Sequence, residues 1–232
     1  MDLTGKRVLV TGGAVRIGKA IVQTLQMAGA EVVVHYHNSK AKAEALSPFT
    51  VQANLQCLED CEKLIKQAGS LDILINNASI FTKDSLPKAT PKRIQQEFET
   101  NLFAPMELIR LFAKQAEPGG AVINLLDRRI CCNDTTCAPY SLTKKALANL
   151  TQLAALEYAP NIRVNAIAPG PVFPPSESST QTAHELAGNL PLENLPTAEN
   201  IAETVLFLLQ ANSITGQIVY VDGGQHLLGN GV

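Results

Sequence analysis

The chain has 232 residues, of which 46% are apolar and 17% charged, and its formal net charge is −2 at pH 7. This length is enough for one domain with a substantial core. The charges are interspersed and no basic run occurs, which argues against nucleic acid or another polyanion as a partner.

The composition also argues against a membrane or secreted protein. No apolar run reaches the ~18 residues that a membrane span requires, and the start, "MDLTGKRVLVTGG", lacks the pattern of a secretory signal. The five cysteines form no CxxC pair, and no histidine lies near the crowded Cys131, Cys132 and Cys137, so we expect no metal. The sequence therefore predicts a reduced, cytoplasmic protein.

Short apolar segments alternate with longer helical patterns along the whole chain. We expect strands at 7–11, 31–36, 49–53, 72–76, 121–126, 163–168 and 217–221. Helices are expected at 17–28, 40–46, 57–68, 91–116, 138–158 and 198–210. Nearly continuous apolar strands rich in Val and Ile are typical of a parallel sheet buried on both faces. The alternation predicts an α/β fold in which residues 1–232 form a single domain, a doubly wound parallel sheet flanked by helices.

The first predicted turn carries glycines at a strand-to-helix junction. The stretch "VLVTGGAVRIGKAI" (8–21) places Gly12, Gly13 and Gly18 between the first strand and the first helix. Such a turn brings the free N–H groups of the helix start up to a pyrophosphate, and a side chain would block that approach. The spacing departs from G-x-G-x-x-G, and glycines also occur in turns that bind nothing, but the position after the first strand favours a dinucleotide site.

The second strand ends in "VVVHYHNSK" (32–40), without the acid that NAD-preferring enzymes place there to bind ribose hydroxyls. The missing carboxylate removes repulsion against a 2′-phosphate, and Asn38, Ser39 and Lys40 offer hydrogen-bond donors. The alternative is an ordinary solvated loop with exposed histidines. We expect NADPH as the cofactor.

A tyrosine and a lysine in "YSLTK" stand four residues apart in a predicted helix. Side chains at this spacing share a helix face, so the Lys144 ammonium can lie near the Tyr140 phenol. A nearby cation lowers the pKa of a tyrosine and makes it a usable acid near neutral pH. A solvated Tyr–Lys pair on an amphipathic helix is the alternative interpretation.

These motifs occur together in a familiar order. The glycine turn is followed by "NNA" at 76–78, by Asn101, by Tyr140 and Lys144, by "PG" at 169–170 and by "TGQIVYVDGG" at 215–224. The chain resembles the short-chain dehydrogenases/reductases over its whole length, which implies a Rossmann fold. It is most similar to the pteridine reductases, including the bacterial dihydromonapterin and dihydrofolate reductase-like members, by four departures from the general pattern. These are Arg16, "HYHNS" at 35–39, serine and phenylalanine in "NNASIF", and Asp127 in place of a serine.

The resemblance implies roles for the matching residues. Cofactor contacts would come from Gly12, Arg16, Ile17, Gly18, Tyr36, His37, Asn38, Ser39, Asn54, Leu55, Asn77, Ala78, Ser79, Tyr140, Lys144, Pro169, Gly170 and Val172. Substrate contacts would come from Arg16, Ser79, Phe81, Asp127 and Tyr140. Asn38 replaces an arginine and Asn54 an aspartate that relatives often carry. Phe81 would stack on a pterin ring opposite the nicotinamide, with core packing as the alternative.

Asp127 lies thirteen residues before Tyr140 and decides the predicted chemistry. Reduction of a ketone pushes negative charge onto oxygen, and at ~4 Å and an effective dielectric near 20 an ionised aspartate would oppose it by about 4 kcal/mol. Reduction of a C=N bond instead requires protonation of a ring nitrogen, which a carboxylate favours. An aspartate without a chemical role, facing solvent after the fifth strand, is the alternative.

The sequence thus predicts an NADPH-dependent reductase of pterins, with Asp127, Tyr140, Lys144 and Asn101 as the catalytic residues and, from the resemblance, a homotetrameric assembly. The alternatives are a ketone reductase of the same fold and a non-catalytic NADPH-binding protein. The proline-rich segment 169–196 would form a substrate loop, since long irregular segments in compact domains are usually functional or disordered.

Overall fold

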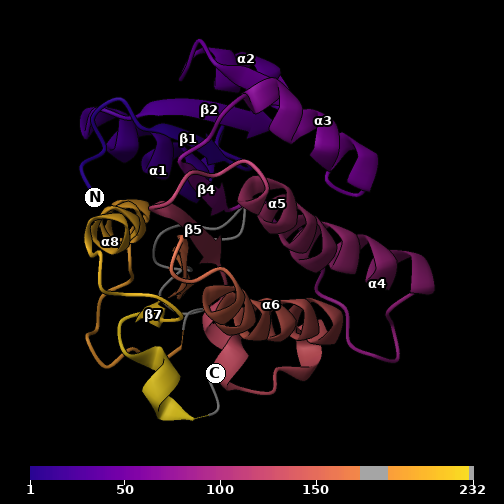
Figure 1. The fold of residues 1–232 in the computed structure, drawn as a ribbon. Helices are drawn as coiled ribbons and strands as arrows, with labels where there is room; N and C mark the ends of the chain where they lie inside the picture. Colours follow the sequence, from indigo (N-terminus) through magenta and orange to yellow (C-terminus); the bar gives the residue numbers. More distant parts are fainter. Residues whose placement is uncertain (173–187, 230–232) are drawn as a thin grey trace.

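Seven parallel strands form one sheet in the computed structural model, which describes residues 1–172 and 188–229 (Figure 1). The strands are β1 (Arg7–Val10), β2 (Glu31–Tyr36), β3 (Thr50–Gln52), β4 (Ile73–Asn76), β5 (Gly120–Leu125), β6 (Ile162–Pro169) and β7 (Ile218–Val221). Their order is β3-β2-β1-β4-β5-β6-β7, and every neighbouring pair is parallel. The order reverses between β1 and β4, where ligands bind in open sheets of this kind. The predicted doubly wound sheet is confirmed.

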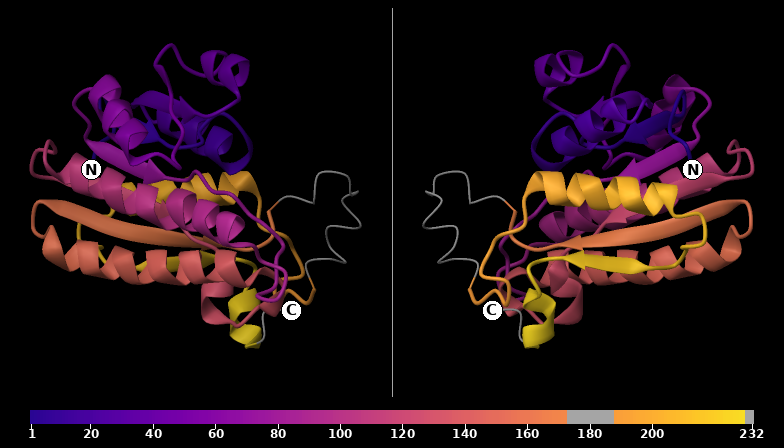
Figure 2. Two further views of the ribbon diagram at one scale, coloured as in Figure 1. Left: turned by 90° about the vertical axis from the view of Figure 1, so that its right-hand side faces the viewer. Right: turned by 90° about the vertical axis from the view of Figure 1, so that its left-hand side faces the viewer.

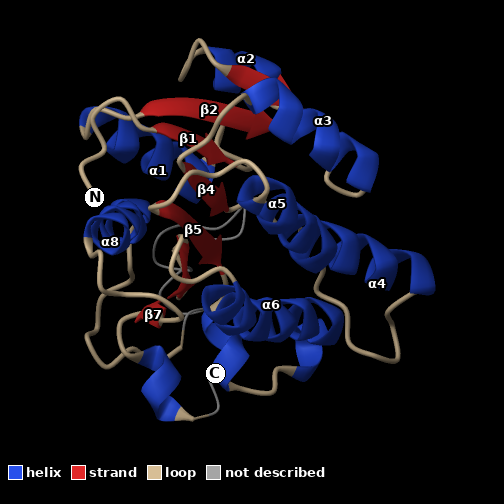
Figure 3. Cartoon of the chain, viewed as in Figure 1, coloured by secondary structure: helices blue, strands red, loops and turns tan. Residues whose placement is uncertain are grey.

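Helices connect the strands as the alternating pattern predicts (Figure 3). The α-helices are α1 (Arg16–Met27), α2 (Lys40–Glu44), α3 (Leu58–Ala68), α4 (Pro91–Phe98), α5 (Ala104–Ala113), α6 (Ala138–Glu157) and α8 (Ala198–Gln210). The π-helical segment η1 (Glu99–Phe103) joins α4 to α5. Short 3₁₀ turns are η2 (Arg128–Cys131), η3 (Thr135–Cys137) and η4 (Gln225–Leu228).

The helices cover both faces of the sheet. Helices α1 and α8 lie on one face, and α3, α5 and α6 lie on the other (Figure 1). Seen from the sides, α6 lies lengthwise beside β6 on one face and α8 on the opposite face (Figure 2). Because both faces are covered, the central strands are buried along their length, as their nearly continuous apolar sequences predict.

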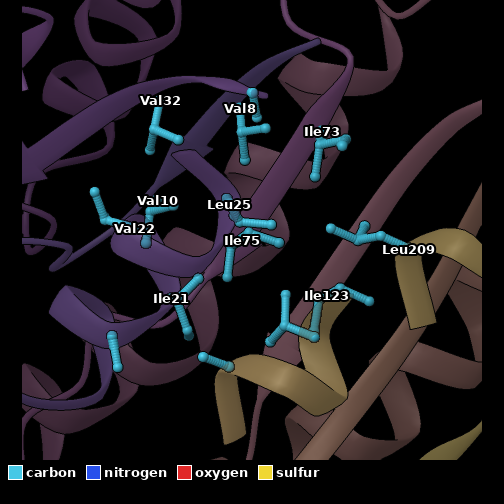
Figure 4. Close-up of a cluster of buried hydrophobic side chains, with 14 of the residues drawn as sticks. Val8, Val10, Ile21, Val22, Leu25, Val32, Ile73, Ile75, Ile123 and Leu209 are labelled. Carbon is cyan, nitrogen blue, oxygen red and sulfur yellow. The ribbon is translucent and has the colours of Figure 1, made fainter. Parts of the chain in front are cut away.

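The apolar residues of the central strands alternate between two core layers. In the layer under α1 and α8, strand side chains such as Val10, Ile75 and Ile123 meet Ile21 and Leu209 (Figure 4). The intervening strand residues form the other layer beneath α3 and α5. The period of two along each strand therefore serves both faces at once, which fixes the register of the sheet.

The predicted helix 91–116 is wrong in its continuity. The structure divides it into α4, η1 and α5, and it ends at Ala113. At the junction the Ala104 N–H donates to the Glu99 carbonyl, a bond across five residues. Pro105 has no N–H and cannot donate to the Asn101 carbonyl as a regular helix would require. The proline thus accounts for a π turn at the segment that carries Asn101.

Two further expectations concern segments rather than the sheet. The predicted substrate loop 169–196 falls largely on residues 173–187, which lie outside the described residues. Across the ranges 1–172 and 188–229, no helix combines the length and apolar character needed to cross a bilayer.

Arg163 on β6 closes the end of α8. Its Nη1 donates to the carbonyls of Leu208, Ala211 and Ile214, and its Nη2 donates to that of Leu209, at 2.8 to 3.2 Å. Burial lowers the pKa of this guanidinium. The side chain therefore supplies donors to the Leu208 and Leu209 carbonyls in the last turn of α8. The carbonyls of Ala211 and Ile214 also accept from the Ile214 N–H and the Asn165 Nδ2.

We expect Arg163→Met to lower the free energy of unfolding by about 2–4 kcal/mol, because partly buried carbonyls lose charged donors. Urea unfolding measures this change. Arg110→Met is the matched control, since Arg110 pairs with Glu107 on an exposed helix surface and such pairs contribute about 0–1 kcal/mol. Equal losses in the two variants would contradict the capping role of Arg163.

Candidate active site

The glycine turn after β1 leaves no room for side chains. Gly12 has φ +61°, and a Cβ there would meet the Ala78 Cα at 3.0 Å. A Cβ on Gly18 would lie 2.3 Å from the Gly12 carbonyl oxygen. Helix α1 starts after Val15 without a side-chain cap and without an acid in its first turn. The open N–H groups and the close backbone suit a pyrophosphate.

Asn77 and Ala78 tie the end of β4 to this turn. The Asn77 Nδ2 donates to the carbonyls of Thr11 and Gly12 at 2.8 and 3.1 Å. The backbone N–H groups of Asn77 and Ala78 both donate to the Thr11 hydroxyl. These two predicted cofactor residues therefore hold the turn in shape, and the hydrogen bonds of the Asn77 amide nitrogen are used within the protein.

His35 is a site residue that the sequence interpretation missed. Its Nδ1 accepts the Gly12 N–H at 3.0 Å, and its Nε2 lies 3.2 Å from the Ala53 carbonyl, so Nε2 carries the proton. The ring is 2% exposed, and burial lowers its pKa to about 4. The interpretation of this histidine as an exposed loop residue is wrong. Its position inside the predicted buried strand 31–36 was the available signal.

The residues predicted to bind adenosine lie at the carboxyl ends of β2 and β3. His37 and Asn38 are exposed and Ser39 is half-buried at the start of α2, with no acid among them. The Asn54 side chain accepts the Gln56 N–H in a tight turn. Tyr36 and Leu55 differ from the rest, because the Tyr36 ring packs in the core beside α1 and Leu55 is buried beneath α3. Their side chains are therefore not presented to a ligand.

Arg16 opens α1 with φ +53°, in the left-handed region that side chains rarely adopt. Strain of this kind persists where the surroundings demand it, commonly at functional sites. The adjacent Ile17 is partly buried against the core layer of α1, as is Val172 after β6. Pro169 ends β6, and Gly170 N–H donates to the Val221 carbonyl at 2.9 Å. These five predicted cofactor residues lie in the turn after β1 and at the carboxyl end of β6.

Asp127 and Tyr140 form a direct hydrogen bond. Tyr140 is the third residue of α6, and its hydroxyl donates to the Asp127 Oδ2 at 3.0 Å. The Asp127 side chain is 16% exposed and Tyr140 is 6% exposed. The Asp127 side chain therefore does not face solvent, as the alternative interpretation of this residue supposed. The thirteen-residue offset brings the carboxylate to the phenol.

Lys144 lies one helical turn beyond Tyr140 and is fully enclosed. Its Nζ donates to the Leu125 carbonyl at 2.8 Å and lies 5.8 Å from the centre of the Tyr140 ring. Burial lowers the pKa of Lys144 to about 8, although the Asp127 carboxylate acts in the opposite direction. The predicted proximity of the two side chains is confirmed.

The expected lowering of the Tyr140 pKa is wrong in direction. Burial raises the pKa of Tyr140 well above its ordinary value, and the charge and hydrogen bond of Asp127 raise it further. Arg129 opposes this effect. The phenol is therefore neutral at physiological pH in this structure and can give a proton rather than take one.

Asn101 organises the loop after β4 from the π segment. It is fully buried, and its Oδ1 accepts from the Ile80 N–H at 2.9 Å and from the Ser79 hydroxyl at 3.0 Å. Its Nδ2 donates to the Ile80 carbonyl at 2.9 Å. The Asn101 carbonyl lacks the donor that residue 105 would supply in a regular helix, because that residue is Pro105. The hydrogen bonds of the Asn101 side chain to Ser79 and Ile80 position the loop after β4.

Phe81 presents an open ring beside Tyr140. The two rings meet edge to face, with centroids 4.8 Å apart at 88°. Phe81 is 53% exposed, so core packing does not explain it. The neighbouring Thr82 N–H donates to the buried Glu97 carboxylate at 2.7 Å, which fixes the loop. A flat ligand could lie on this ring.

Arg129 is the second residue that the sequence interpretation missed. Its Nη1 lies 3.3 and 3.2 Å from the two carboxylate oxygens of Asp127, and its Nε donates to Asp134 at 2.9 Å. Its guanidinium carbon lies 5.6 Å from the centre of the Phe81 ring. Burial opposes the charge, but Asp127 and Asp134 raise the pKa of Arg129. The basic pair that follows Asp127 in sequence was the only available signal.

The described residues contain no cluster of His, Cys, Asp and Glu side chains that could hold a metal ion. Within these residues the cysteines are free, with Cys132 and Cys137 buried and Cys131 exposed. The candidate site consists of the glycine turn after β1, which we call the glycine cradle, the side chains of Asp127, Tyr140 and Lys144, and the exposed Phe81 ring.

Comparisons with known proteins place the chain in a family. The family model described as enoyl-(acyl carrier protein) reductase matches residues 12–226. The chain therefore belongs to the short-chain dehydrogenase/reductase superfamily, within the family that this model describes.

Similar proteins include a 3-oxoacyl-[acyl-carrier-protein] reductase, an L-xylulose reductase and an alternative dihydrofolate reductase. The 3-oxoacyl-[acyl-carrier-protein] reductase of Staphylococcus aureus is 33% identical, over 96% of this chain and 98% of that protein. The L-xylulose reductase of Bos taurus is also 33% identical, over 97% and 98%. The crystal structure of alternative dihydrofolate reductase 1 (FolM) from Brucella canis with NADP is 36% identical, with a TM-score of 0.92 over 97% and 96% of the chains. Structural neighbours thus include complexes with NADP and with NADPH.

The buried His35 predicts a specific pH dependence of stability. With a pKa of about 4 in the folded protein against 6.5 in the unfolded chain, the unfolded state binds more protons between these values. The free energy of unfolding should therefore fall by about 3 kcal/mol through this residue as the pH drops from 6.5 to 4. Urea unfolding at several pH values measures this fall.

His35→Asn should remove that part of the pH dependence, because asparagine does not titrate. His37→Asn is the control, since His37 is exposed at the end of the same strand. If His35→Asn unfolds with the pH dependence of the unaltered protein, the buried neutral ring is not the cause.

Proposed function

We propose that this protein is an NADPH-dependent reductase of pterins, acting on the C=N bond of a dihydropterin or of dihydrofolate. The hydrogen bond between the Tyr140 hydroxyl and the Asp127 carboxylate carries the proposal. The similarity to the FolM structure supports it, because that protein is described as a dihydrofolate reductase in complex with NADP.

The cradle after β1 fits a dinucleotide. Gly12 and Gly18 admit no side chain, the start of α1 is uncapped, and no acid follows β2 to repel a 2′-phosphate. The residues that would hold the cofactor are the backbone at Gly12–Gly18, the His37–Ser39 segment and the Asn77–Ser79 loop, with Lys144 at the ribose. When bound, NADPH supplies the hydride. Preference for NADPH follows from the missing acid and from the NADP complexes among structural neighbours.

Tyr140 is the proton donor in this proposal. Its raised pKa keeps the phenol neutral, and its proton already points at Asp127. Once the phenol has donated its proton to a ring nitrogen, the adjacent carboxylate can take up a proton from water and pass it to the phenolate, which restores the donor. Phe81 would hold the flat heterocycle by stacking, and Arg16 and Ser79 would border it. Asn101 keeps this loop in place through its bonds to Ile80.

The electrostatics favour a substrate that gains positive charge. A carboxylate beside the reacting atoms stabilises a protonated ring nitrogen and opposes an oxyanion. Ketone reduction is the second candidate, because the two relatives at 33% identity are named for carbonyl substrates. Arg129 also offsets part of the Asp127 charge, which lessens the barrier to an oxyanion.

A substrate panel tests the proposal. NADPH oxidation is followed with dihydrobiopterin, dihydrofolate, acetoacetyl-coenzyme A and L-xylulose as separate substrates. We expect the largest kcat/KM for a dihydropterin or dihydrofolate. Brisk reduction of the carbonyl substrates without reduction of either nitrogen heterocycle would make the protein a ketone reductase.

Replacement of the carboxylate should act on chemistry more than on cofactor binding. We expect Asp127→Ser to lower kcat/KM for the dihydropterin by about 10²–10³-fold, a range typical of lost acid–base assistance. The Kd for NADPH, measured by fluorescence titration, should change less than about threefold.

Asp72→Ser is the control for Asp127→Ser, since this carboxylate precedes β4 and pairs with Lys6 at the opposite end of the sheet. A parallel loss of cofactor affinity and turnover in Asp127→Ser would argue against the chemical role. The third candidate is a protein that binds NADPH without catalysis. It would be favoured if the wild type binds NADPH but reduces no substrate of the panel and Tyr140→Phe alters no measured property.

We also propose that the protein forms a homotetramer through α5 and α6. Helix α6 exposes Leu142, Leu153 and Leu156 on one face, and Phe103 and Met106 are exposed where η1 meets α5. Exposed apolar side chains gathered on helices commonly mark an interface. The resemblance to a superfamily whose members usually assemble through these helices supports this assignment.

Leu153→Lys should convert a tetramer to a smaller species, because it places a charge in the proposed apolar contact. Light scattering coupled to size-exclusion chromatography measures the mass. Met27→Lys, an exposed position on α1, is the control and should keep the wild-type mass. A monomeric wild-type protein, or a tetramer unaffected by Leu153→Lys, would contradict this interface.

A further inference from the structure

Arg129 places a positive charge near Tyr140, the proposed proton donor, because both side chains contact Asp127. Its Nη1 lies 3.2 Å from the Asp127 Oδ2, the same oxygen that accepts the Tyr140 hydroxyl at 3.0 Å. The three side chains therefore form a chain of cation, carboxylate and phenol. The field of Arg129 also reaches Tyr140, whose pKa it acts to lower.

The guanidinium is held in place independently of Asp127. Its Nε donates to the Asp134 Oδ2 at 2.9 Å. Asp134 is itself fixed, because it accepts from the Thr136 N–H at 2.8 Å and from the Thr136 hydroxyl at 2.6 Å. The Arg129 side chain is 27% exposed, and its guanidinium lies over the Phe81 ring. This anchoring keeps the charge beside the substrate position whatever the state of Asp127.

A fixed cation at this place changes the charge that a substrate meets. Without it, the Asp127 carboxylate would be uncompensated beside Phe81 and Tyr140, which favours a ring that becomes cationic and disfavours a carbonyl that becomes an oxyanion. With it, part of that negative potential is offset. At about 6 Å from the reacting atoms and an effective dielectric near 20, one unit charge changes the preference for a C=N over a C=O substrate by about 10²-fold.

We propose that Arg129 is a specificity-determining residue that sets the balance between C=N and C=O substrates at this site. It does so by offsetting the Asp127 charge, so that the site retains some capacity to reduce carbonyl groups. This inference rests on the proposed site chemistry and deepens it, because it assigns the second substrate class to one side chain.

The ratio of two activities tests the assignment. The kcat/KM values for dihydrobiopterin and for acetoacetyl-coenzyme A are measured with NADPH in the wild type, Arg129→Gln and Arg129→Lys. We expect Arg129→Gln to lower the carbonyl activity at least about tenfold and the pterin activity less than about threefold. Arg129→Lys, which keeps the charge but loses the fork that joins Asp127 to Asp134, should keep the wild-type ratio within about threefold.

The ratio of the two kcat/KM values separates an effect of the Arg129 charge from a purely structural role of its side chain. If Arg129 only holds the loop, both activities fall together in Arg129→Gln and Arg129→Lys, and the ratio stays constant, which overturns the inference. Arg7→Gln is the matched control, since Arg7 pairs with Glu31 where β1 and β2 begin, at the opposite end of the sheet. It should leave both activities unchanged.

The same data distinguish this inference from the proposed function. A wild-type protein that reduces only the carbonyl substrate refutes the pterin assignment, and Arg129→Gln must then still lose at least about tenfold of that activity. If the wild type reduces only the pterin, the carbonyl activity assigned to Arg129 is absent, and the inference is overturned while the proposed function stands.

Discussion

The hydrogen bond from the Tyr140 hydroxyl to the Asp127 carboxylate is the interaction on which the rest of this site depends. It joins the end of β5 to the start of α6 and places a neutral acid against a negative charge. Burial keeps the proton on the phenol, and Lys144 is enclosed beneath it with a lowered pKa. A short-chain reductase with a serine in place of Asp127 would offer a second donor here, whereas this site offers an acceptor.

The fold serves this arrangement by bringing separate strand ends to one edge. The order of the sheet reverses between β1 and β4, so the glycine cradle and the loop that carries Phe81 are neighbours. Pro105 interrupts the helix after that loop, and the resulting π turn carries the buried Asn101, which holds Ile80 in position. His35 completes the support from the other side by binding the Gly12 N–H.

Sequence periodicity predicted the sheet and most helices, because parallel strands buried on both faces leave a direct apolar signature. Helix spacing predicted that Tyr140 and Lys144 meet, whereas the place of Asp127 beside them was implied by the resemblance to the short-chain reductases. The contacts of His35 and Arg129 could not be predicted this way, because each joins residues from different elements through side-chain geometry. The predicted direction of the Tyr140 pKa shift was wrong because helix spacing shows that the lysine is near but does not show that the phenol is buried.

The ionisation of Tyr140 shows whether this side chain can be the proton donor of the site. The chain has four tyrosines, so the difference in near-ultraviolet absorbance between wild type and Tyr140→Phe during a pH titration isolates this one. We expect Tyr140 to form no phenolate below its ordinary pKa of 10 in the free protein. Formation of a Tyr140 phenolate near neutral pH would contradict it, because the site would then hold a base where a proton donor is required.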